Sequence, residues 1–142
     1  MKRILVALDG SLQSAKVLAA AVRMAGFAGA QLVLYRAISI PVDLPPEAFG
    51  AGAVPLDDLM RRNAHADLER LASELPRDLV EQIVVDVATA WDGICREARE
   101  RDADLIVLGA RGYGRIARFL GTTAAHVADH ADRNVLVVRT EV

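Results

Sequence analysis

The sequence has 142 residues, 53% apolar and 25% charged, with a formal net charge of −2. These values fit one soluble globular domain over residues 1–142, and the slightly acidic balance argues against nucleic acid as the main partner. No apolar run has membrane length or reads as a secretory signal, and Cys95 is the only cysteine. A cytoplasmic protein without a membrane partner is therefore expected.

Residues 4–8 form an uninterrupted apolar run that ends at Asp9, which is typical of a parallel strand buried on both faces. Ser11 can cap a helix, so the pattern predicts one from there to about residue 27. Asp9 then lies at the carboxyl end of a central strand, where it serves either the turn or a ligand. The stripe expected to be buried on the helix contains Leu12, Val17, Ala20, Ala21 and Met24.

Alternating strands and helices continue to the end of the sequence. This alternation predicts an α/β fold, a doubly wound open sheet of five parallel strands with helices on both faces. A long irregular loop is expected over residues 39–56, which contain four prolines and two glycines. The further strands are expected at residues 32–38, 83–87, 105–108 and 135–138. One further helix is expected from Asp57 or Asp58 to residue 75. Another follows the strand at residues 83–87 and ends at about residue 101, and the last begins at Thr122 or Thr123.

A glycine-rich segment follows the strand at residues 105–108. Backbone N–H groups approach a phosphate most closely where no Cβ intervenes, and a helix start adds unpaired N–H groups and the positive end of its dipole. Strand, glycine loop and helix start together predict a phosphate-binding site, with a surface loop and its helix caps as the alternative. The glycines are Gly109, Gly112, Gly114 and Gly121, and the arginines between them are Arg111, Arg115 and Arg118.

The spacing Gly109-x-x-Gly112, followed by Gly121-Thr122, resembles the nucleotide signature G-x2-G-x9-G-[ST] of the universal stress protein family. The opening RILVALDGS, the segment IARFLGTTAAHVADHA and the closing NVLVVR occur in the family's order, so the resemblance covers the whole chain. One departure is that eight residues, rather than nine, separate Gly112 from Gly121.

The resemblance implies a Rossmann-like fold with strand order 3-2-1-4-5 and an adenine-nucleotide-binding regulatory role in stress response. ATP is the implied ligand, with ADP or AMP as variants and Mg²⁺ able to accompany the nucleotide. The implied adenosine site is Asp9 with the main chain at Ala37. The implied phosphate site comprises Gly109, Arg111, Gly112, Gly121, Thr122 and Thr123.

The resemblance also implies a homodimer paired through the strand at residues 135–138. A family member that binds no nucleotide, and acts through dimerisation and protein partners, is the alternative that the short spacing favours. Enzymatic activity is left uncertain and at most weak ATP hydrolysis is expected, because no nucleophile elbow or Walker lysine is present. A related pyrophosphatase-type enzyme would have S-G-G-x-D-S after the first strand, which residues 9–14 lack.

Two further side-chain patterns are interpreted as structural. His126 and His130 have the spacing of a helical metal-binding pair, but no third ligand is evident, so helix-end histidines are favoured and no metal site is predicted. Cys95 lies on the apolar face of its helix and is expected to be a small core residue.

Overall fold

The computed structural model describes residues 1–40, 55–110 and 120–139 of the chain. In these ranges a five-stranded sheet has the order β3-β2-β1-β4-β5, with every neighbouring pair parallel. The predicted α/β fold and strand order are confirmed. The elements are β1 Arg3–Ala7, α1 Ser14–Ala28, β2 Gln31–Ile38, α2 Leu56–Ser73, β3 Val80–Val87, α3 Ala90–Glu100, β4 Leu105–Gly109, α4 Thr122–His130 and β5 Asn134–Val138.

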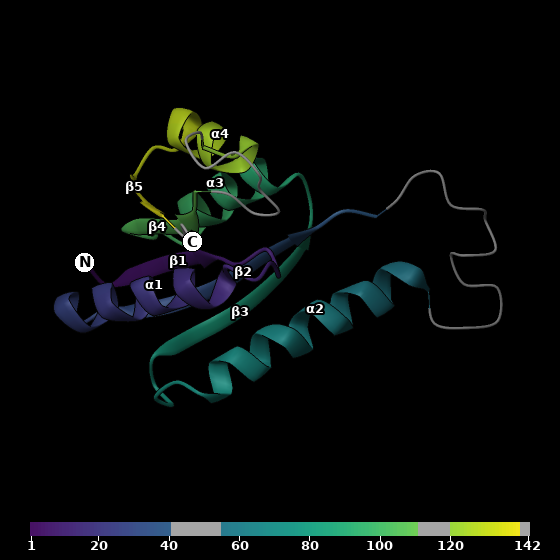
Figure 1. The fold of residues 1–142 in the computed structure, drawn as a ribbon, viewed down its shortest axis with the longest axis horizontal. Helices are drawn as coiled ribbons and strands as arrows, with labels where there is room; N and C mark the ends of the chain where they lie inside the picture. The colour runs from purple at the N-terminus through teal and green to yellow at the C-terminus, as the bar shows by residue number, and fades with distance from the viewer. Residues whose placement is uncertain (41–54, 111–119, 140–142) are drawn as a thin grey trace.

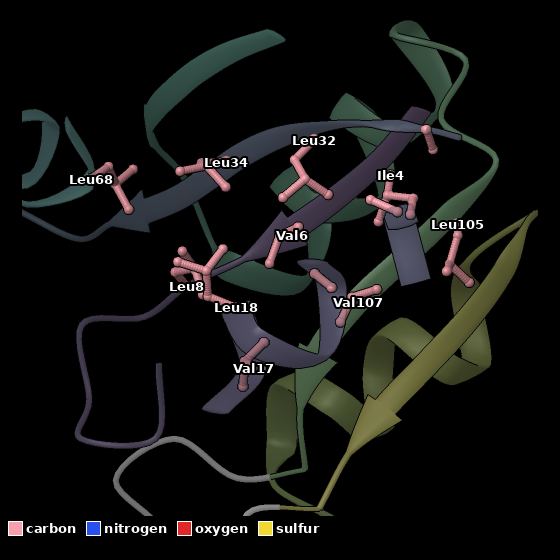
Figure 2. Close-up of a cluster of buried hydrophobic side chains, with 13 residues drawn as sticks. Ile4, Val6, Leu8, Val17, Leu18, Leu32, Leu34, Leu68, Leu105 and Val107 are labelled. Carbon is pink, nitrogen blue, oxygen red and sulfur yellow. The ribbon is translucent and has the colours of Figure 1, made fainter. Parts of the chain in front are cut away.

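Two hydrophobic layers hold the helices to the sheet. Helices α1 and α2 cover one face, and α3 and α4 lie together on the other (Figure 1). Strands β1 and β4 are continuous apolar runs in the sequence because their side chains are buried on both faces of the sheet. Leu5 and Val6 of β1, which point to opposite faces, are both at 0% exposure. None of the helices in the described ranges is long and apolar enough to span a bilayer. The first layer, drawn in Figure 2, includes Ile4, Val6, Leu8, Val17, Leu18, Leu32, Leu34, Leu68, Leu105 and Val107.

Helix α1 begins later than predicted. Its first residue is Ser14 rather than Ser11, and Leu12 is 97% exposed instead of buried. The reason is a turn after β1 in which Gly10 adopts a positive φ of 81° and the Ser14 N–H donates to the Ser11 carbonyl at 3.1 Å. Residues 10–13 therefore belong to the turn, and Leu12 projects into solvent. The helix ends at Ala28, close to the predicted residue 27, and its C-cap residue Gly29 has a φ of 69°.

The other boundaries match the predictions or differ from them by at most three residues. Helix α2 ends at Ser73 rather than residue 75, and β3 begins at Val80 rather than residue 83. Helix α3 buries Cys95 as expected, together with Ile94 and Ala98. The predicted loop over residues 39–56 lies largely outside the described residues.

Candidate functional site

A pocket lies at the carboxyl ends of β1, β2 and β4. Strands β1 and β4 are neighbours although their sequences are far apart, so this is the switch point at which open α/β sheets bind ligands. The empty space in the pocket is about 530 Å³, part of which is solvent at its mouth. The wall is mainly apolar, with contributions from α1 and α3 as well as from the strand ends, and includes Ala7, Leu8, Val17, Ala90, Ile94 and Leu108.

The structure brings four of the predicted site residues together. Asp9, Ala37, Gly109 and Thr123 come from the ends of β1, β2 and β4 and the start of α4, and all four line this one pocket. They meet because the carboxyl ends of parallel strands share one edge of the sheet. Gly121 and Thr122 immediately precede Thr123 and are not among the lining residues. Arg111 and Gly112 lie outside the described residues.

The Asp9 carboxylate has a structural role in addition to its place in the pocket. Its Oδ1 accepts the Ser11 backbone N–H at 2.9 Å and the Ser14 hydroxyl at 3.4 Å. These bonds stabilise the turn before α1, as the turn interpretation of Asp9 expects. Among the described residues no donor is bonded to Oδ2.

At the opposite side of the pocket, α4 begins without a side-chain cap. Gly121 is the N-cap residue and offers no side chain, while its carbonyl accepts the Ala125 N–H at 3.0 Å. The first N–H groups of a helix have no partner within the helix, and they carry the positive end of the dipole. Thr123, in this first turn, adds a hydroxyl to the lining. This end of the pocket therefore favours an anion.

The floor of the pocket contains Tyr35, which sequence reasoning missed. Its side chain is fully buried and its hydroxyl donates to Asp86 Oδ2 at 3.2 Å. Asp86 is also ion-paired with Arg96 on α3. Burial, and then the nearby Asp86 charge, raise the pKa of the Tyr35 hydroxyl well above its ordinary value. Tyr35 is therefore a neutral donor that links the floor of the pocket to α3.

Arg36 is the second lining residue that sequence reasoning missed. Its side chain is 21% exposed, and its Nη1 lies 3.4 Å from Asp67 Oδ2 on α2. The guanidinium extends past the end of β1 and lies against Gly10, where a Cβ would come within 2.5 Å of Nη2. The sequence feature that could have identified Arg36 is its position next to Ala37, at the end of a strand that lies beside a glycine turn.

The two histidines of α4 are held by the helix and by Trp91. Each Nδ1 lies within hydrogen-bonding distance of the carbonyl four residues earlier, at 2.8 Å for His126 and 2.9 Å for His130. The Trp91 ring centroid is 5.3 Å from that of His126 and 4.6 Å from that of His130. Within the described ranges no group of three His, Cys, Asp or Glu side chains could hold a metal.

Cys95 packs in the second hydrophobic layer, between α3 and the sheet. Burial raises the pKa of its thiol above the ordinary value. A protonated, buried thiol behaves as a small core residue rather than a nucleophile.

A family model and a relative that match this chain belong to the same protein family. A model of the universal stress protein family matches residues 1–139. Universal stress protein Sll1388 of Synechocystis sp. is 32% identical over 152 aligned positions, which cover 96% of this chain and 97% of that protein.

Solved structures with similar folds include two nucleotide complexes. A universal stress protein in complex with cAMP is 28% identical, with a TM-score of 0.65, over 99% of this chain and 98% of the other. The universal stress protein from Archaeoglobus fulgidus in complex with dAMP is 24% identical, with a TM-score of 0.64, over 96% of this chain and 97% of the other.

Proposed function

This chain belongs to the universal stress protein family, and we propose that it is an adenine-nucleotide-binding regulatory module in stress response. The observation that carries the proposal is the meeting of Asp9, Ala37, Gly109 and Thr123 in one pocket at the switch point. The cAMP complex of a protein 28% identical to this chain supports an adenine nucleotide as the ligand class. ATP is the proposed ligand, and ADP or AMP would use the same adenosine contacts.

In this proposal the adenosine lies toward β1 and β2. Asp9 accepts hydrogen bonds from the nucleoside, while the main chain at Ala37 contacts the base. The apolar wall, which includes Leu8 and Ile94, buries the flat surface of the base. Asp9 suits this role because its Oδ1 is fixed by the turn, which holds the carboxylate in place.

The phosphates then lie toward β4 and α4. Gly109 and Thr123 belong to the pocket, and the resemblance adds Arg111, Gly112, Gly121 and Thr122 to the phosphate contacts. A helix start contributes only about 0.3–1 kcal/mol on an exposed site. Micromolar affinity requires roughly 8 kcal/mol, so the nucleoside contacts must supply much of it. Any Mg²⁺ would arrive on the phosphates of the nucleotide.

The proposal is one of binding and regulation rather than turnover, and slow ATP hydrolysis would not contradict it. We also propose that residues 1–142 form one domain, that the protein acts in the cytoplasm, and that it dimerises through β5. The dimer proposal rests on β5, an apolar strand at the edge of the sheet whose Val135, Leu136, Val137 and Val138 are only partly buried.

Calorimetric titration of nucleotide-stripped protein with ATP and adenosine tests the binding proposal. Asp9→Ala is expected to weaken both ligands alike, since its contact is with the nucleoside. Gly112→Val is expected to abolish ATP binding, because a β-branched side chain blocks the approach of a phosphate to the backbone. Gly26→Val is the matched control, since a Cβ at Gly26 in α1 has no heavy atom within 4 Å. It should leave ATP binding unchanged.

No heat and no thermal shift with millimolar ATP would contradict the proposal. The family member without nucleotide, acting through dimerisation and protein partners, would then be the better description. Its specific support is the spacing of eight residues between Gly112 and Gly121. Insertion of a ninth residue between Tyr113 and Leu120 would show whether this spacing is the cause.

A further inference from the structure

Within the part of the chain that the structure describes, Arg36 has more hydrogen-bond donors than its protein neighbours satisfy. Its side chain is only 21% exposed, and within the described residues its one acceptor is Asp67 Oδ2, at 3.4 Å from Nη1. Asp67 itself is engaged more closely by Arg70, whose Nη2 lies 2.8 Å from Oδ1. A guanidinium carries five N–H donors, and a mostly buried one requires acceptors for them. The remaining donors of Arg36 are therefore available to whatever occupies the pocket.

The guanidinium of Arg36 lies at the rim of the pocket, against Gly10. A Cβ at Gly10 would lie 2.5 Å from Arg36 Nη2 and 2.8 Å from Cζ, so a side chain at position 10 would displace the flexible end of Arg36 from this place. Gly10 also has a positive φ of 81°, which L side chains rarely adopt. The side chain of Arg36 is therefore in direct contact with the turn that carries Asp9.

The position of Arg36 places it with the nucleoside rather than the phosphates. Arg36 directly precedes Ala37 on β2 and reaches Gly10, next to Asp9. Gly109 and Thr123, at the end that favours an anion, lie beyond β1, because the strand order places β1 between β2 and β4. Asp9 offers only acceptors and Arg36 only donors, a combination that suits a nucleoside carrying both kinds of group.

We propose that Arg36 is a nucleoside-binding residue of this pocket, which donates hydrogen bonds to acceptor atoms of the purine base or the ribose. This inference rests on the proposed function and adds to it a specificity-determining contact. Within the described residues Arg36 donates one long hydrogen bond to Asp67, and the ligand competes with Asp67 for the guanidinium.

Calorimetric titration of Arg36→Met with ATP and with adenosine tests this role. Methionine keeps an unbranched chain of similar length and removes the donors. Both ligands should weaken by the same factor, about tenfold to a hundredfold, which is what loss of hydrogen bonds to a charged group typically produces. Arg23→Met, on an exposed position of α1, removes the same charge away from the pocket and should change neither affinity. Unchanged adenosine affinity in Arg36→Met, or a loss confined to ATP, would overturn the nucleoside contact.

Asp67→Asn separates ligand contact from a merely structural role. If Arg36 contacts the ligand, weakening its bond to α2 should leave adenosine affinity equal to wild type or higher, and Arg36→Met should be equally harmful in both backgrounds. A loss in Asp67→Asn as large as that in Arg36→Met would mean that Arg36 acts only by holding α2, and would overturn the proposal. Wild-type binding with no Arg36 effect removes this inference alone, whereas no wild-type binding removes the proposed function and this inference with it.

Discussion

The hydroxyl oxygen of Tyr35 lies where a side chain at Gly93 would begin, since a Cβ at that position would be 2.0 Å from it. Gly93 lies within α3, where glycine costs about 1 kcal/mol of helix stability relative to alanine. The helix therefore carries a poor helix former at the point where it meets the floor of the pocket. Glycine at this position leaves room for Tyr35 to stay buried with its hydroxyl hydrogen-bonded to Asp86.

Gly93→Ala is expected to destabilise the protein in spite of its better helix propensity. Overpacking of this kind typically costs about 1–3 kcal/mol. Urea unfolding should show the loss, and Tyr35→Phe in the same background should recover part of it by removing the clashing oxygen. Gly26→Ala in α1, where a Cβ meets open space, is the matched control and should be neutral or stabilising. Equal stability of the two alanine variants would contradict the argument.

The ion pair between Arg3 and Glu81 should make stability depend on pH in acid. Arg3 Nε lies 2.5 Å from Glu81 Oε2 and Nη2 lies 2.7 Å from Oε1, and this hydrogen bonding lowers the pKa of Glu81 below its ordinary value. A group whose folded pKa is lowered contributes stability above its unfolded pKa and loses it as the pH falls through the folded value.

Glu81→Gln removes the charge and the titration together. At neutral pH it should cost roughly 0.2–1 kcal/mol, because the pair is about one-third exposed and screened by solvent. The difference between wild type and Glu81→Gln should shrink below about pH 4.3, the ordinary glutamate value. Urea unfolding at a series of pH values measures it, and a difference that stays constant from pH 7 to pH 2 would refute the assignment.

Dimerisation through β5 predicts that Val137→Asp produces a monomer, since a carboxylate would be buried beside its copy in the paired strands. Light scattering should give a dimer for wild type. Val87→Asp on β3, the opposite edge strand, carries the same change and should leave the mass unchanged. A wild-type monomer at high micromolar concentration would remove the proposal. Circular dichroism checks that both variants are folded.

Trp91 should report on the contact between α3 and α4. It is the only tryptophan and lies against His126 and His130. His130→Ala should shift its emission to longer wavelength by exposing the indole to water, with a loss of stability of about 1 kcal/mol or less. His65→Ala, on α2, removes a histidine elsewhere and should leave the emission unchanged. A shift in both variants, or in neither, would show that the stacking does not shield the indole.

The sheet could be predicted from sequence because its central strands are buried on both faces. Continuous apolar runs at β1 and β4 are hard to accommodate in any other way, and the alternation with helices limits the topology. The strand order came from the family resemblance. The start of α1 was predicted wrongly because a capping serine was weighed without the turn that Asp9 and Gly10 form before it.

The pocket was predictable to the extent that strand ends determine it. Asp9 and Gly109 line it because they lie at or just after the ends of β1 and β4, a property visible in the sequence, whereas Ala37 came from the family resemblance. Arg36 was not predictable in the same way, because an arginine in an apolar strand reads as a side chain that avoids the core. Its proposed role depends on its contact with Gly10, beyond the end of the neighbouring strand β1, and that contact joins positions that no local pattern connects.

The pairing of β1 with β4 has a consequence for the order in which the protein can assemble during synthesis. Ile4 lies opposite Leu105, so the first strand gains its second neighbour only after more than one hundred residues have been made. Strands β1, β2 and β3 can associate earlier, but contacts of such large sequence separation form slowly. The pocket-lining residues Leu108, Gly109 and Thr123 are also synthesised after the first hundred residues. A nascent chain therefore has no complete pocket until Thr123 has been made, and a ligand of this pocket can be bound only after that point.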